Sequence, residues 1–116
     1  MENKNRNQMK NMLQELSKNL RNVYGDKLKA VILYGSVARG TQKEGSDIDI
    51  MVLVDGDDAM LRSFWNELSD VSTEMALKYL EVFSIIDVSY QVYNDWKNVS
   101  PFYRNVSEEG VVLYAA

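Results

Sequence analysis

The chain has 116 residues, of which 46% are hydrophobic, and it contains neither cysteine nor histidine. This length predicts one globular domain over residues 1–116, and the missing sulfur and imidazole ligands mean that any metal ion must be held by oxygen. The formal net charge is −4, and because proteins that bind polynucleotides usually carry a basic surplus, nucleic acid is disfavoured as the main substrate.

Apolar runs are too short for a membrane protein. No run approaches the roughly 20 residues that a membrane-spanning helix needs, and the N-terminus lacks the apolar core of a signal peptide. The sequence therefore predicts a cytoplasmic protein that does not associate with a membrane.

The first half of the chain predicts a helix and two strands. Apolar residues recur at helical spacing over residues 3–24, and Gly25 follows as a C-terminal cap. Residues 28–34 form an apolar run that stops at Gly35, as a buried strand does. Residues 47–54 alternate between two sets of side chains, which predicts a second strand.

The middle of the chain predicts a helix and a third strand. Asp57 or Asp58 caps a helix whose apolar stripe, including Trp65, continues to Tyr79. The mostly apolar run 82–92 predicts the third strand, and a connection follows it.

The C-terminal part predicts a short helix and an edge strand, together covering about residues 100–114. Ser100 and Pro101 have the residue types of a helix start, and Gly110 ends the helix before a final apolar run. With an N-terminal helix at about 3–24 and a core at about 28–92, the expected fold class is α/β: a mixed central sheet of about four strands flanked by helices.

A turn of small residues follows the first strand. Gly35 has no side chain, so a ligand can approach the backbone, and Ser36 offers a hydroxyl and an N–H group. If residues 37–40 begin a short helix, its free N–H groups point at an anion above the turn, for which a triphosphate is the best candidate. Arg39 either adds positive charge there or pairs with Glu44.

Three aspartates are candidates for a metal site. Asp47 and Asp49 are two residues apart, so on one strand they share a face with Cα atoms roughly 6.6 Å apart, and together they suit a hard cation such as Mg²⁺. Asp87 interrupts an apolar run, and burying an unpaired carboxylate costs several kcal/mol. It is therefore either a third ligand or an acid on the solvent face of an edge strand.

The motif formed by Gly35-Ser36, Asp47-x-Asp49 and a later Asp87 resembles the signature of the minimal nucleotidyltransferases (MNT) of the DNA polymerase β-like superfamily. The similarity spans residues 28–114 and includes four further positions or segments: Tyr34, Ala38–Gly40, Ser46 and Glu109–Tyr114.

The resemblance implies a role for each residue of the motif. Asp47, Asp49 and Asp87 would be the catalytic carboxylates that hold two magnesium ions, with Asp87 also activating the acceptor. ATP would be the nucleotide donor, and its phosphates would be bound by four residues: Gly35, Ser36, Arg39 and Ser46.

The resemblance also implies a partner protein. The catalytic core uses nearly the whole chain, so another polypeptide would either supply acceptor recognition or be the acceptor itself, in a possible hetero-oligomer. The leading hypothesis is AMP transfer to a tyrosine hydroxyl of a HEPN-type toxin, which makes this chain an antitoxin. The alternatives are nucleotidyl transfer to a small molecule such as an aminoglycoside, and a non-catalytic antitoxin that acts by binding.

Overall fold

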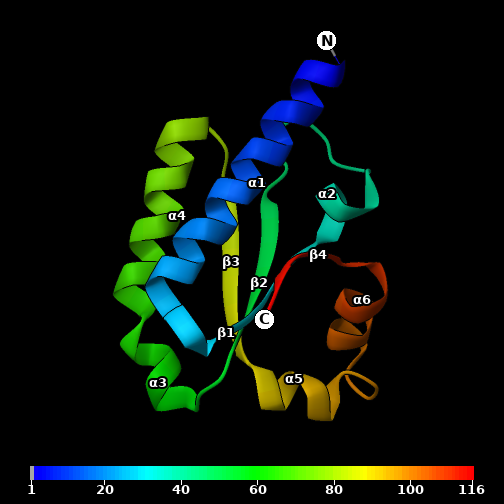
Figure 1. The fold of residues 1–116 in the computed structure, drawn as a ribbon. Helices are drawn as coiled ribbons and strands as arrows, with labels where there is room; N and C mark the ends of the chain where they lie inside the picture. Colours follow the sequence, from blue (N-terminus) through cyan, green and yellow to red (C-terminus); the bar gives the residue numbers. More distant parts are fainter. Residues whose placement is uncertain (1) are drawn as a thin grey trace.

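The computed structural model describes the backbone of residues 2–116 and the side chains from residue 7 onward, and it confirms the mixed α/β fold (Figure 1). Four strands form one sheet in the order β3-β2-β1-β4. Strand β1 is antiparallel to β2 and β4, whereas β2 and β3 are parallel. The strands are β1 (Leu28–Tyr34), β2 (Ile48–Val54), β3 (Phe83–Ser89) and β4 (Val111–Ala115).

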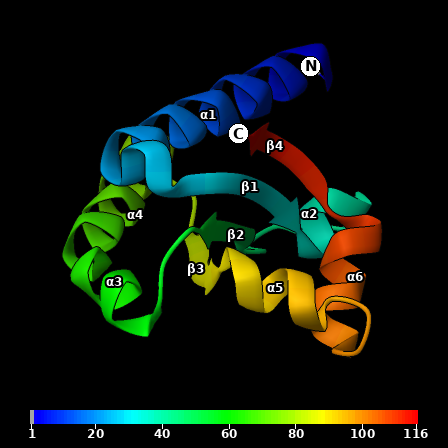
Figure 2. The ribbon, with the colours of Figure 1, turned by 60° about the horizontal axis from the view of Figure 1, so that its bottom comes forward.

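Helices cover both faces of this sheet (Figure 2). On one face α1 packs beside α4, and on the other α5 and α6 contact the strands. The short α2 follows β1 directly, and a 3-10 turn joins α1 to β1. The helices are α1 (Glu2–Tyr24), η1 (Gly25–Lys27), α2 (Gly35–Arg39), α3 (Asp58–Ser63), α4 (Trp65–Tyr79), α5 (Tyr90–Trp96) and α6 (Pro101–Glu109). Within the described residues, no helix combines the length and apolar character needed to cross a bilayer.

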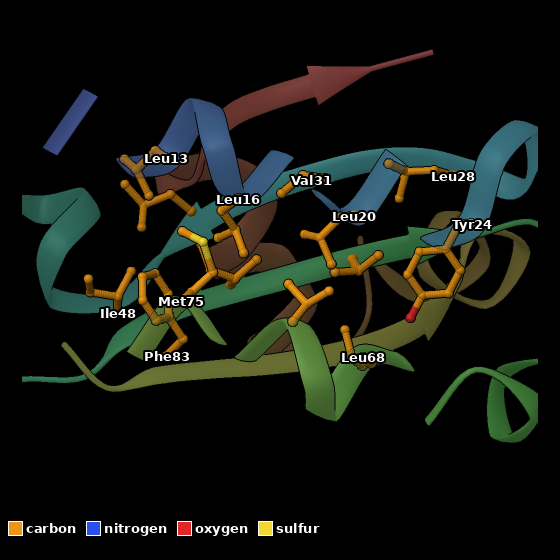
Figure 3. Close-up of a cluster of buried hydrophobic side chains, with 14 of the residues drawn as sticks. Leu13, Leu16, Leu20, Tyr24, Leu28, Val31, Ile48, Leu68, Met75 and Phe83 are labelled. Carbon is orange, nitrogen blue, oxygen red and sulfur yellow. The ribbon is translucent and has the colours of Figure 1, made fainter. Parts of the chain in front are cut away.

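The larger hydrophobic core lies between the sheet and the pair α1 and α4 (Figure 3). Leu16 and Leu20 of α1 are fully buried against Val31 of β1 and Met75 of α4. Burying each of these side chains contributes about 1.5–3 kcal/mol. The helical spacing of apolar residues therefore predicted both α1 and the face that it buries.

Strand β2 separates two cores because its side chains alternate. Ile50 and Val52 point to the α1 and α4 face, whereas Met51 and Leu53 join a second cluster under α5 and α6. Asp49 has the same parity as Met51. Its carboxylate therefore belongs to the α5 and α6 face of the sheet.

The predicted helix from Asp57 or Asp58 to Tyr79 is two helices in the structure. The Asp57 side chain caps α3 by accepting a hydrogen bond from the Met60 N–H group at 2.9 Å. The backbone then departs from helical geometry at Phe64 (ψ 1°), which separates α3 from α4. Trp65, predicted to lie on the apolar stripe, is 54% exposed.

The predicted strand 82–92 ends earlier than expected. Strand β3 stops at Ser89, whose hydroxyl accepts a hydrogen bond from the Val92 N–H group at 3.4 Å and so caps α5. Helix α5 occupies the segment expected to finish the strand and begin a connection. The next cap was predicted correctly, because Ser100 and Pro101 begin α6 as expected.

Candidate active site

The two predicted carboxylates lie where β1 and β2 meet. Asp49 is the second residue of β2 and pairs with Tyr34, the last residue of β1. Asp47 precedes the strand and is exposed, whereas Asp49 is partly buried. Gly35 follows Tyr34 at once, so the turn after β1 lies directly against the first residues of β2.

Gly35 is required by both backbone conformation and space. Its φ of +75° lies in the left-handed region that side chains other than hydrogen disfavour. A Cβ atom built on Gly35 would overlap the carboxylate of Asp49. The glycine therefore lets the Asp49 carboxylate lie against the turn. This close approach explains why the sequence motif has glycine at position 35.

The charges at this junction are unfavourable without a cation. Loss of solvent, and secondly the charge of Asp47, raises the pKa of the Asp49 carboxyl above its ordinary value, while Arg39 opposes the shift. Burial and the charge of Asp49 also raise the pKa of the Tyr34 hydroxyl. Two neighbouring carboxylates that repel each other suit a hard divalent cation.

Asp87 does not join the other two aspartates, which corrects the expected cluster of three carboxylates. The parallel register aligns Asp87 with Val52, three residues beyond Asp49, or about 10 Å along the strand. This odd offset places Asp87 on the opposite face, where its Oδ2 accepts a hydrogen bond from Trp65 Nε1 at 3.0 Å. Within the described residues no three acidic side chains gather as a metal site.

The two predicted serines lie in the segment between β1 and β2. The carbonyl of Ser36 accepts a hydrogen bond from the Thr41 N–H group at 2.9 Å. Ser46 forms a reciprocal turn with Lys43, since its Oγ accepts from the Lys43 N–H group and its own N–H group donates to the Lys43 carbonyl, both at 2.9 Å. The Ser46 hydroxyl therefore holds the loop before Asp47 and still has a proton to donate.

Arg39 pairs with a residue that the sequence did not suggest. Its guanidinium lies 3.5 Å from the Glu109 carboxylate of α6, and about half of each side chain is exposed. The considered partner Glu44 is exposed and is not the residue in contact. The Arg39 charge thus acts on Asp49 while the ion pair connects α2 to α6.

A cavity of about 200 Å³ adjoins this junction, between the β1–α2 turn and α6. Tyr34 forms one wall and meets Phe102 edge to face, with 5.6 Å between ring centroids. Three lining residues were not predicted, although their helical spacing places them on one face of α6: Phe102, Asn105 and Glu109. A larger hollow of about 580 Å³ lies beside α1 and β4, and neither Asp47 nor Asp49 is among the lining residues of either space.

Comparison with known proteins agrees with this geometry. Residues 7–116 match the family described as "Polymerase beta, Nucleotidyltransferase". The chain is 39% identical over 102 residues to "Putative protein adenylyltransferase MJ0604" of Methanocaldococcus jannaschii, which covers 88% of this chain and 94% of that protein. It is 28% identical over 85 residues to aminoglycoside nucleotidyltransferase (4') of Staphylococcus aureus, covering 73% of this chain and 32% of that enzyme.

Solved structures share the fold. A crystal structure of a mutant of the toxin-antitoxin MntA-HpeT matches with a TM-score of 0.60 at 21% identity, covering 90% of this chain and 73% of that chain. A second mutant matches with a TM-score of 0.55 at 26% identity, covering 88% and 71%. A chain from the complex of tri-AMPylated Shewanella oneidensis HEPN toxin with MNT antitoxin matches at 0.54 and 19%, covering 90% and 71%.

The family match extends over almost the entire sheet and both helical layers, and it includes the glycine turn that holds Asp49. The adenylyltransferase relative is aligned over nearly its full length. This chain belongs to the polymerase β nucleotidyltransferase family and is a nucleotidyltransferase.

Proposed function

We propose that this chain is a magnesium-dependent protein adenylyltransferase that moves AMP from ATP to a tyrosine hydroxyl of a HEPN-type toxin, and so acts as its antitoxin. One observation carries the proposal: Gly35, which also lines the cavity, gives space to the Asp49 carboxylate beside Asp47. A curated relative named for protein adenylylation matches the chain over 94% of its own length.

Asp47 and Asp49 are the residues that would hold the cation. Both offer carboxylate oxygens, the ligands that Mg²⁺ prefers, and a positive charge would relieve their mutual repulsion. When bound, such an ion would neutralise charge on the triphosphate and polarise the phosphorus that is attacked. The bare backbone at Gly35 permits close approach of a phosphate, with Ser36 and Arg39 available to it from α2.

The proposed transfer is a single displacement at the α-phosphorus of ATP. The tyrosine oxygen forms a bond to this phosphorus while the bond to the bridging β-phosphate oxygen breaks. Pyrophosphate leaves with the electron pair, and the hydroxyl proton passes to solvent. The chain's contribution is to position the triphosphate and to place negative carboxylates where a cation stabilises the added charge.

A protein acceptor is supported by the relatives. One structurally similar chain comes from a complex in which the HEPN toxin is tri-AMPylated. A second, at 26% identity, comes from a toxin-antitoxin structure. Each added AMP brings bulk and negative charge, which would repel an RNA backbone from a ribonuclease surface. Catalysis would therefore be enough to neutralise such a toxin.

The test is labelling of a co-encoded partner. The purified chain, radiolabelled ATP and Mg²⁺ are incubated with the protein encoded beside it, and the label is expected on that protein. Asp49→Asn should abolish labelling, whereas Asp70→Asn, the same change at an exposed position of α4, should not. A chelator should also remove activity. Equal labelling by the Asp49 and Asp70 variants would contradict the proposal.

A small-molecule acceptor is the second candidate, and the similarity to aminoglycoside nucleotidyltransferase (4') favours it. The chain covers only 32% of that enzyme, so the aligned part leaves most of the enzyme unmatched. Incubation with aminoglycosides in the absence of any protein partner distinguishes the two. Labelled drug without labelled protein would support this second function.

Neutralisation by binding alone makes a different prediction. A double variant with Asp47→Ala and Asp49→Ala removes both carboxylates and leaves every other surface side chain in place. If this variant still suppresses the partner's toxicity at equal stoichiometry, binding is sufficient. If suppression is lost while the complex still forms, the antitoxin effect requires transfer.

A further inference from the structure

Strand β3 reaches the active-site face through a residue that the sequence motif did not include. The parallel register aligns Ser84 with Asp49, and aligned residues of neighbouring strands point to the same face. Their Cα atoms are therefore separated by about one strand spacing, roughly 4.8 Å. The Ile48 N–H group donates to the Val82 carbonyl at 2.8 Å, which extends the β2–β3 hydrogen bonding past this pair.

We propose that Ser84 occupies the third-ligand position of the metal site, so that a neutral hydroxyl stands where the motif predicted a carboxylate. The protein then contributes two negative charges, from Asp47 and Asp49, and the divalent cation enters mainly as its complex with the nucleotide. This inference rests on the proposed metal-dependent function and deepens it.

The charges around the site support a dependence on nucleotide. Two carboxylates leave most of the six positions around Mg²⁺ to be filled by other oxygens. The nearby cation Arg39 weakens the negative potential at Asp49, and it does so before any metal binds. Phosphate oxygens of ATP can supply both the missing ligands and the missing charge, so free Mg²⁺ should bind weakly and the nucleotide complex tightly.

Asp87 cannot replace Ser84 by a local adjustment. Moving Asp87 opposite Asp49 would require β3 to slide by three residues, or about 10 Å. Because an odd shift exchanges the two faces of a strand, the slide would also remove Phe83 from the larger core and Val88 from the smaller one. It would break the Trp65–Asp87 hydrogen bond as well.

The test measures Mn²⁺ binding directly, by the loss of the free-ion signal in electron paramagnetic resonance. Without nucleotide, Ser84→Asp should tighten Mn²⁺ binding by at least about tenfold, because affinity rises with the number of charged ligands. Ser84→Asn, which changes size without adding charge, should not. With the analogue AMP-PNP present, Asp49→Asn should weaken binding strongly and Asp87→Asn should leave it unchanged.

The outcomes separate this inference from the proposed function. If Asp49→Asn leaves Mn²⁺–AMP-PNP binding intact, the metal-dependent function itself is wrong. If Asp49→Asn weakens binding but Ser84→Asp is no better than Ser84→Asn, the place of Ser84 is wrong. Should Ser84→Asp fail to fold, the Asp87 variant still decides, since weakening equal to that of Asp49→Asn would restore Asp87 as the third ligand.

Discussion

Replacing Gly35 with alanine tests whether the glycine turn positions Asp49. The residue has φ +75°, and holding alanine there costs roughly 1–2 kcal/mol. The new methyl group also overlaps the Asp49 carboxylate, which must leave its position at an additional cost of about 0.5–1.5 kcal/mol. The first cost concerns stability alone, whereas the second displaces a residue proposed to bind the cation.

Gly40→Ala is a matched control in the same part of the chain. Gly40 has φ +74°, nearly the same as Gly35, but a Cβ atom there meets nothing within 4 Å. This variant therefore bears the backbone cost without displacing Asp49. Thermal unfolding should show both variants to be less stable, with Gly35→Ala the lower by several degrees, since about 1 kcal/mol corresponds to about 4–8 °C in a small domain.

Transfer of label from ATP separates the two costs. We expect Gly35→Ala to reduce the transfer rate roughly 10²-fold at a temperature where both variants are folded, because a displacement of about 1 Å at a catalytic group has effects of this size. Gly40→Ala should keep most of the activity. Equal rates for the two variants would refute the argument that Gly35 exists to admit the Asp49 carboxylate.

Three further predictions follow from the charges and the core. Because the pKa of Asp49 is raised in the folded protein, its ionised form opposes folding. Asp49→Asn should therefore raise the melting temperature at neutral pH. This gain in melting temperature should vanish below pH 3.8, the ordinary pKa of the aspartate side chain. Since Arg39 lowers that pKa, Arg39→Gln should move the acid limb of the transfer rate to higher pH. Loss of its exposed pair with Glu109 should change stability by at most about 1 kcal/mol. Leu16→Ala should cost about 2–5 kcal/mol in urea unfolding because Leu16 is fully buried, whereas the exposed Leu77→Ala should stay within about 0.5 kcal/mol.

Local signals in the sequence predicted most of the fold. The helical spacing of apolar residues gave α1 and its buried face, and the residue types at Ser100, Pro101 and Gly110 gave the bounds of α6. Signals that compete with one another were harder to interpret. Ser89 is both the last residue of β3 and the N-cap of α5, so the predicted strand wrongly continued past it to residue 92.

The part of the candidate site that comes from one short segment of the sequence could be predicted. Asp47 and Asp49 share a strand edge, so their spacing alone indicated that they lie together. Asp87 belongs to another strand, and its face depends on the register between β2 and β3. A run of apolar residues does not encode that register, because a shift of one residue exchanges the faces. Ser84 was missed for the same reason, because its alignment with Asp49 depends on the register between β2 and β3.

Asp87 and Asp49 lie on opposite faces of the sheet, and their carboxylates are compensated in different ways. On the α1 and α4 face a carboxylate needs a partner, and Asp87 has one in the indole N–H group of Trp65 at the start of α4. On the α5 and α6 face Asp49 is desolvated beside Asp47, and its repulsion is relieved only in part by Arg39. Asp87 is thus satisfied within the fold, whereas Asp49, which we propose to bind the cation, is only partly compensated. Asp87→Asn should accordingly lower stability and leave Mn²⁺–AMP-PNP binding intact. Asp49→Asn should instead raise stability and weaken Mn²⁺–AMP-PNP binding.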